Sequence, residues 1–297
     1  MTEPAIEVRD LVKIFPRKDA VRGISFTVPT GTICGLVGPN GSGKTTTIQM
    51  FLDLCPPSSG SVRVLGMDPR RDYVSLLRRI GYVPEKHHMY EWMSVRQLLE
   101  FAAAVYPRWD WQEFKRINSI LQMPEDRRVG DLSRGEMAKL ALLIALAHKP
   151  DLLILDEPTS GLDPLVRREF LEAIVALLEQ GDRTVFFSTH ILPDVERVAD
   201  RVIVLSEGEI VADASLSDLR SLFLRVSFLF EETPAPDRDL PGARRVEKGL
   251  REWVALFDSA KEPKIREIAR DIGAKDVMIQ TMTLEDIFVE LVQKKGE

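Results

Sequence analysis

The chain has 297 residues, of which 44% are hydrophobic and 29% charged, and its formal net charge is −6. This length suits one large domain or two domains of ordinary size, and the composition is that of a globular protein. Because acidic residues outnumber basic ones, the chain has no general attraction to nucleic acid phosphates, and we expect no nucleic acid partner.

Cys34 and Cys55 are the two cysteines of the chain. Without a paired motif or a nearby His they make neither a metal site nor a disulfide framework, which suits a reducing compartment. The first ten residues lack the apolar segment of a secretory signal, and the longest apolar run, 140–147, is too short to span a membrane. If the protein serves a membrane, we expect a partner to supply the spanning part.

The hydrophobic pattern of the first half of the chain alternates between strand and helix. It predicts strands at 5–15, 23–28, 32–37, 61–66 and 80–85, and helices at 45–54 and 73–80. From Ser94 onward the period becomes that of amphipathic helices, at 95–106 and 111–123. These helices form an insertion about as long as a subdomain.

A glycine-rich motif, GPNGSGKTT, lies at 38–46 between a predicted strand and a predicted helix. It matches the P-loop pattern G-x-x-x-x-G-K-[ST], in which small residues let backbone N–H groups turn inward and the helix adds its positive end. We therefore predict a phosphate cage in which Lys44 reaches the β- and γ-phosphates and the Thr45 hydroxyl holds Mg²⁺. Its predicted nucleotide-binding residues are Gly38, Pro39, Asn40, Gly41, Ser42, Gly43, Lys44, Thr45 and Thr46.

Phe15 has two interpretations, and Ser133 already has a structural one. Phe15 ends the first predicted strand, and it is either a core aromatic or a platform on which adenine stacks. Ser133 and Glu136 form an S-x-x-E capping box, which alone would explain both residues at the start of a helix.

Two acidic residues and a histidine follow buried strands in the second half of the chain. The apolar strand at 152–155 ends in Asp156 and Glu157, and the strand at 184–189 ends at His190. Carboxylates at the carboxyl end of a central parallel strand lie in the crevice where such sheets bind ligands. Because a P-loop lies upstream, we predict that this pair supplies the acid on the metal side.

After about Ser221 the pattern changes to strand-like segments, a hairpin that turns at Lys248 and Gly249, and two helices. We predict a small α+β appendage at 221–297, without a catalytic constellation, after a larger domain at 1–220.

Taken together, GPNGSGKTT, LSRGE, LLILDEP, SGLD and STH, in this order between residues 38 and 190, resemble the motifs of the ATP-binding cassette (ABC) ATPases. The resemblance covers most of residues 6 to about 221 and is closest to single-cassette subunits of bacterial drug, peptide and antibiotic exporters. It implies an α/β fold: a P-loop NTPase core with a mixed or parallel sheet, an antiparallel β subdomain, and a helical subdomain at about 86–149.

In this family the P-loop of one cassette and the signature of a second cassette close around one ATP, so a head-to-tail dimer holds two sites. The resemblance places the signature at 132–136, with Ser133 and Gly135 binding nucleotide across the interface of a homodimer or a related heterodimer. It also implies that Glu157 is the general base, that Asp156 supports Mg²⁺, and that His190 contacts the γ-phosphate, with Lys44 as the third catalytic residue.

Three residues depart from the family pattern. Arg134 stands where glycine is usual, and it would either strengthen the attraction for ATP or hinder close approach of the partner. Glu136 stands where glutamine is usual. Glu85 also replaces a glutamine; its carboxylate can still ligate Mg²⁺, but it adds negative charge near the γ-phosphate.

The segment after Glu85 reads KHHMYEWMSV. Its adjacent histidines point in different directions and lack further ligands, so we predict no metal site there. Its apolar side chains either pack within the helical subdomain or, as the resemblance implies, receive a short coupling helix from a membrane subunit. They are Met89, Tyr90, Trp92 and Met93.

The resemblance implies an ATPase subunit that powers export through separate transmembrane permease subunits, in the cytoplasm and peripheral at the inner face of the cell membrane. The alternative is a soluble cassette ATPase that acts on ribosomes or nucleic acid. Such proteins generally carry two cassettes or a long coiled coil, whereas this chain has one P-loop and no sustained heptads between Lys44 and Ser133. The intact catalytic residues argue against a regulator that only binds nucleotide.

Overall fold

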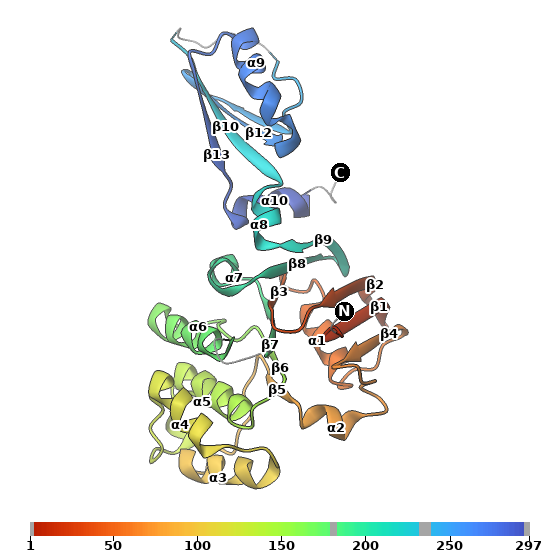
Figure 1. The fold of residues 1–297 in the computed structure, drawn as a ribbon, viewed down its shortest axis with the longest axis vertical. Helices are drawn as coiled ribbons and strands as arrows, with labels where there is room; N and C mark the ends of the chain where they lie inside the picture. Colours follow the sequence, from red (N-terminus) through yellow and green to blue (C-terminus); the bar gives the residue numbers. More distant parts are fainter. Residues whose placement is uncertain (1–2, 179–182, 232–238, 294–297) are drawn as a thin grey trace. The chain divides into compact units, whose positions relative to one another are not determined.

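The computed structural model describes residues 3–178, 183–231 and 239–293 (Figure 1). The chain divides into two compact units, Met1–Asp213 and Ala214–Glu297. The predicted boundary at 220/221 is therefore too late. Helix α8 (Leu216–Arg220) belongs to the second unit, because it lies against α10 (Leu284–Gln293) and fully buries Leu219.

The first unit is built on a sheet of six strands within the described part of the chain, in the order β5-β6-β7-β3-β8-β9. The first five of these strands run parallel to their neighbours. Every residue of β3, β6 and β7 is buried, as expected for central strands of a parallel sheet. The strands are β3 (Ile33–Val37), β5 (Ile80–Val83), β6 (Leu152–Asp156), β7 (Thr184–Thr189), β8 (Arg201–Ser206) and β9 (Glu209–Ser215).

An antiparallel sheet of order β2-β1-β4 lies in the same unit: β1 (Ile6–Phe15), β2 (Lys18–Val28) and β4 (Ser59–Val64). Phe26 of β2 stacks on Phe186 of β7 at 6.2 Å between ring centroids. Phe51, at the end of α1 (Lys44–Phe51), meets both rings edge-on. This aromatic cluster joins the two sheets through the helix that follows the P-loop.

The helical insertion contains α3 (Val95–Val105), α4 (Trp111–Leu121) and α5 (Arg134–Ala147), with a short 3₁₀ turn at Val129–Asp131 before α5. Ser94 and Ser133 cap α3 and α5, each with a reciprocal capping box. The predicted capping role of Ser133 is thus confirmed. The remaining helices of this unit are α2 (Tyr73–Leu77), α6 (Pro164–Leu178) and α7 (Leu192–Val198).

The second unit has an antiparallel sheet of order β11-β12-β10-β13. The hairpin predicted at Lys248 and Gly249 is confirmed, since it joins β11 to β12 in antiparallel register. Helix α9 packs Ile265 and Ile268 against one sheet face (Figure 1). The elements are β10 (Phe223–Leu229), β11 (Arg245–Lys248), β12 (Glu252–Asp258), a 3₁₀ turn (Ser259–Lys261), α9 (Glu262–Ile272), β13 (Asp276–Thr281) and α10.

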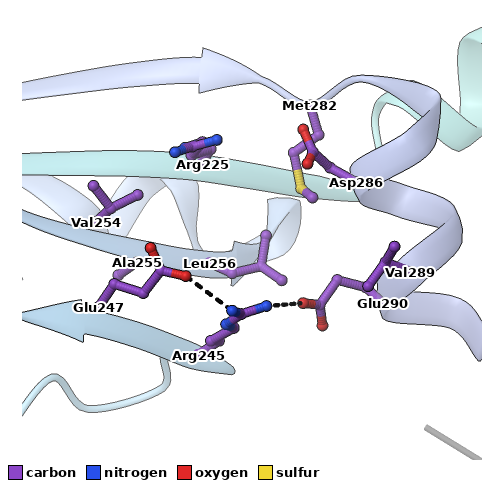
Figure 2. Close-up of a pocket in the computed structure, with 10 residues that line it drawn as sticks. All are labelled: Arg225, Arg245, Glu247, Val254, Ala255, Leu256, Met282, Asp286, Val289 and Glu290. Atoms are coloured by element: carbon purple, nitrogen blue, oxygen red, sulfur yellow. Dashed lines mark ion pairs between the residues drawn. The ribbon is translucent and has the colours of Figure 1, made fainter. Parts of the chain in front are cut away.

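A cavity of about 140 Å³ lies between this sheet and α10 (Figure 2). Arg245 forms ion pairs there with Glu247 at 2.9 Å and with Glu290 at 4.0 Å. Across both units, none of the described helices is long and apolar enough to cross a membrane.

Candidate functional site

A hollow of about 360 Å³ opens beside the P-loop. Three neighbouring strands end at this place: β3 leads into the P-loop, β6 into Asp156 and Glu157, and β7 into His190. In an open parallel sheet, the carboxyl ends of such strands form the ligand crevice. The hollow is lined by Phe15, Lys18, Ala20, Asn40, Gly41, Gly43, Lys44, Thr45, Thr46, Glu85, Glu157, Ser160 and His190.

The backbone of the P-loop requires glycine at specific positions. Gly41 and Gly43 have φ angles of 81° and 111°, in the left-handed region that other residues rarely adopt. A Cβ atom on Gly43 would lie 2.4 Å from the carbonyl oxygen of Ala20, and one on Gly38 would lie 2.1 Å from that of Leu205. The loop is therefore a cradle with room for a ligand's oxygens but not for side chains.

Lys44 is held inside this cradle. Its Nζ donates hydrogen bonds to the carbonyl oxygens of Gly38, at 2.8 Å, and Pro39, at 3.2 Å. It also lies 3.0 Å from Oε1 of Glu157, as an ion pair rather than an aligned hydrogen bond. Both side chains are buried, 5% and 7% exposed. The ammonium group of Lys44 therefore lies in the cradle, where phosphate oxygens can replace the carbonyl and carboxylate oxygens that now contact it.

Asp156 and Thr45 form the pair expected at the metal. The Thr45 hydroxyl donates to Oδ1 of Asp156 at 3.1 Å, and Ser188 Oγ donates to the same oxygen at 2.6 Å. Burial raises the pKa of Asp156, and the negative charges of Glu157 and Glu85 raise it further against these two hydrogen bonds.

The donor set at this pair fits Mg²⁺, which prefers hydroxyl and carboxylate oxygens and keeps several waters and phosphate oxygens as ligands. Such an ion needs few protein ligands. In the described residues no group of three or more His, Cys, Asp or Glu is arranged to hold a metal by itself. The hydroxyl of Thr45 and the carboxylate of Asp156 are therefore suitable ligands for this cation.

Glu157 and His190 meet at the edge of the same hollow. Oε2 of Glu157 lies 2.8 Å from Nδ1 of His190. Glu157 has a positive φ of 48°, which is costly for a residue with a side chain. Its backbone N–H donates to Ser188 Oγ at 3.0 Å, which holds the residue in this conformation.

Phe15 is 39% exposed and lines the hollow, so the structure does not place it in the core. Lys13 Nζ lies 5.1 Å from the centre of its ring. Sequence reasoning missed Lys18, which donates a hydrogen bond to the carbonyl oxygen of Gly41 at 2.6 Å. No motif marks Lys18 in the sequence; it reaches the P-loop because it pairs with Phe15 across the tight β1–β2 turn.

Ser133 and Gly135 are not among the residues that line the hollow of their own chain. Ser133 Oγ accepts from the backbone N–H of Glu136 at 3.2 Å, and Glu136 Oε2 accepts from that of Ser133 at 2.8 Å. Arg134 folds against its own chain: a Cβ atom on Gly161 would lie 2.5 Å from its Nη1. Ser133 is the N-cap of α5, and Arg134 is the first residue of this helix.

The fold and the P-loop site define a P-loop NTPase. A family model described as ABC transporter matches residues 21–160. Nod factor export ATP-binding protein I of Rhizobium meliloti (strain 1021) is 40% identical, over 98% of this chain and 89% of that protein. A solved structure titled "Structure of ATP binding subunit of ABC transporter" is 29% identical, with a TM-score of 0.65 over 73% of this chain and 92% of that one.

The chain therefore belongs to the ABC transporter family, as an ATP-binding subunit with the fold of the family's ATPases. It is also 36% identical to the probable multidrug ABC transporter ATP-binding protein YbhF of Escherichia coli (strain K12) over 74% of its own length. In that case it spans only 38% of the relative.

Proposed function

We propose that this chain binds ATP with Mg²⁺ in the P-loop hollow, hydrolyses it in a pair of cassettes, and drives export through separate transmembrane permease subunits. The observation that carries the proposal is that Lys44 and His190 each lie within ion-pair distance of Glu157, one at each of its carboxylate oxygens. The export direction is supported by the name of the Rhizobium meliloti relative, a Nod factor export protein whose match covers 98% of this chain.

Different residues would bind different parts of the nucleotide. Phe15 stacks on adenine, the P-loop N–H groups bind the phosphates, and Lys44 exchanges carbonyl oxygens for phosphate oxygens. Bound Mg²⁺ supplies positive charge that stabilises the transferring phosphoryl group. Thr45 and Asp156 hold it, with Glu85 at the rim of the hollow.

Glu157 acts as the general base that orients the attacking water and accepts its proton. His190 contacts the γ-phosphate from the neighbouring strand end. Their 2.8 Å separation lets both groups act on one point in the hollow.

A second cassette completes the site. The first N–H groups of α5 have no partners within the helix, so Ser133, Gly135 and this helix end suit the γ-phosphate bound to the partner's P-loop. The partner is a second copy or a related cassette. Because Arg134 folds back on Gly161, it leaves this helix end open to the partner.

An exposed apolar surface supports docking of a membrane subunit. Leu54, Val74 and Val105 are 56%, 62% and 59% exposed around a groove of about 580 Å³. Tyr90 and Trp92 are also exposed, with 6.2 Å between their ring centroids, so they do not pack in the interior of the helical subdomain. Apolar patches of this kind mark interaction sites. We assign this surface to a permease segment, which would hold the chain at the inner face of the membrane.

Steady phosphate release from MgATP by the purified chain tests the ATPase function. We expect turnover in the wild type and its loss in Glu157→Gln, with binding of a fluorescent ATP analogue retained, since Gln keeps the shape but cannot accept the proton. Equal turnover in the two proteins would contradict the role of Glu157.

Purification from detergent-solubilised membranes tests the transport function. We expect a multispanning membrane protein to co-purify with the wild type, and Val74→Asp to lose it while keeping ATP binding. Recovery only with ribosomes or nucleic acid would overturn the transporter assignment in favour of the alternative.

A further inference from the structure

The two loops that carry Glu157 and His190 are joined at a second place, several residues beyond the catalytic pair. Asp194, in the first turn of α7, is 2% exposed and lies four residues after His190. Its Oδ2 accepts a hydrogen bond from the hydroxyl of Thr159 at 2.5 Å. Thr159 is also 2% exposed and lies two residues after Glu157.

The other oxygen of Asp194 is bound by α6. Nε of Arg167 donates to Oδ1, and the two side chains form an ion pair. Arg167 lies one helical turn after Asp163, whose Oδ1 accepts from the N–H groups at the start of α6. One buried carboxylate therefore fixes the loop from Glu157 to α6 against the loop from His190 to α7.

The conformation of Glu157 makes such a connection necessary. The left-handed backbone at this residue persists only where its surroundings over-determine it. On the strand side, Ser188 provides the hydrogen bond to its N–H. On the loop side, the carbonyl of Glu157 accepts from Ser160 at 3.1 Å, and the adjacent Thr159 is the residue anchored by Asp194.

We propose that Asp194 is a positioning residue for ATP hydrolysis: through Thr159 and Arg167 it holds the carboxylate of Glu157 at hydrogen-bond distance from His190. The inference rests on the proposed function of that pair. Asp194 touches neither the hollow nor the P-loop among their described contacts, so its effect is on geometry rather than on nucleotide binding.

The test compares isosteric variants of the full chain. Asp194→Asn removes the charge, Thr159→Val removes the hydroxyl, and Thr159→Ser keeps it. We expect Asp194→Asn to lower kcat by up to about 100-fold, the effect of misplacing a reacting group by about 1 Å, with KM for ATP changed less than about twofold. Thr159→Val should lower kcat in the same way, Thr159→Ser should restore it, and the double variant should lose less than the product of the single losses.

Glu113→Gln is the matched control. Glu113 of α4 is a carboxylate of similar burial, 5% exposed, and it pairs with Arg116 of the same helix and with Arg183, which precedes β7. It should lower stability but leave kcat unchanged. If Asp194→Asn lowers stability as this control does and leaves kcat within twofold of wild type, Asp194 is only a structural ion pair and the inference is overturned.

A crystal structure of Asp194→Asn separates this inference from the proposed function. We expect the distance between Glu157 Oε2 and His190 Nδ1 to exceed the present 2.8 Å. Absence of ATP turnover in the wild-type chain would contradict the proposed function. The distance between Glu157 and His190 in the variant would still test the positioning role of Asp194. An unchanged distance would overturn the positioning whatever the turnover.

Discussion

Lys44 and Glu157 form an ion pair in the hollow, with 3.0 Å between Nζ and Oε1 and both side chains nearly out of contact with solvent. A nucleotide that binds Lys44 therefore releases the carboxylate that is proposed to act on water. The spacing of the P-loop and the acidic pair after an apolar strand were enough to predict these residues. Ser188 and Asp194 were not predictable, because isolated polar residues in a strand or a helix follow no pattern and acquire partners only when distant loops meet.

Glu85→Gln should retain ATP turnover. The side chain is exposed at the rim of the hollow, where an amide oxygen can replace one carboxylate oxygen as a Mg²⁺ ligand. Removal of a negative charge near the γ-phosphate should also not weaken ATP binding. Phosphate release measured beside wild type checks this, and complete loss of turnover in a normally folded variant would show that the carboxylate itself is required.

Glu113→Gln should change the pH dependence of stability. Burial alone would raise the pKa of Glu113, but hydrogen bonds from Arg116 and Arg183 outweigh it and hold the pKa below its usual value of 4.5. A carboxylate with a lowered folded pKa contributes stability above the unfolded pKa, and this contribution disappears as the pH falls through the folded value. At pH 7 the free energy of unfolding of the wild type should exceed that of the variant by about 2 kcal/mol, within the usual range for a lost buried interaction.

Urea unfolding at pH 7, 5 and 3.5 checks this expectation. The difference between the two proteins should be constant from pH 7 to about pH 5 and should shrink toward pH 3.5. A difference that grows as the pH falls would contradict the assigned direction of the pKa shift.

At the scale of elements, hydrophobic periodicity predicted the type and order of most strands and helices, because buried faces impose it. The short helices α7 and α8 and the strand β9 were not predicted. Boundaries were less accurate. Helix α1 was predicted at 45–54 but ends at Phe51, and the positive φ of Asp53 shows that the chain turns out of the helix there. A left-handed Asp is only a weak signal in the sequence, because Asp adopts this conformation less often than Gly, so this end was not predictable.

Ser133→Ala and Ser94→Ala should separate helix capping from nucleotide contact. Both serines cap their helices with the same reciprocal box, so each variant should lose about 1 kcal/mol of unfolding free energy. Only Ser133→Ala should also reduce ATP turnover, because only α5 carries the proposed contact to the partner's γ-phosphate. Denaturant unfolding and phosphate release measure the two effects, and equal turnover in both variants would limit Ser133 to its cap.

At the scale of the whole molecule, the chain holds two units with separate hydrophobic clusters. The existence of the appendage was predictable from the change of pattern near Ser221, but its start was not. A short helix such as α8 can pack on either neighbour, and its assignment depends on the contact with α10, more than 60 residues later in the chain.

ATP should stabilise only the first unit. With Glu157→Gln to prevent hydrolysis and MgATP at 100 times its Kd, binding should add about 2.7 kcal/mol to that unit's stability. Differential scanning calorimetry should therefore show one transition that moves upward and a second that stays in place. Equal shifts of both transitions would mean that the two units unfold together.

The strand order of the second unit has a practical consequence for handling the protein. One edge of this sheet, β11, is short and carries Arg245, Glu247 and Lys248, charges that discourage pairing with another chain. The other edge, β13, has six residues in regular register with β10, and its exposed Met278 and Ile279 are followed by uncharged side chains. Overproduced without its partners, the chain is expected to aggregate through β13. The substitution Ile279→Lys should keep it in solution.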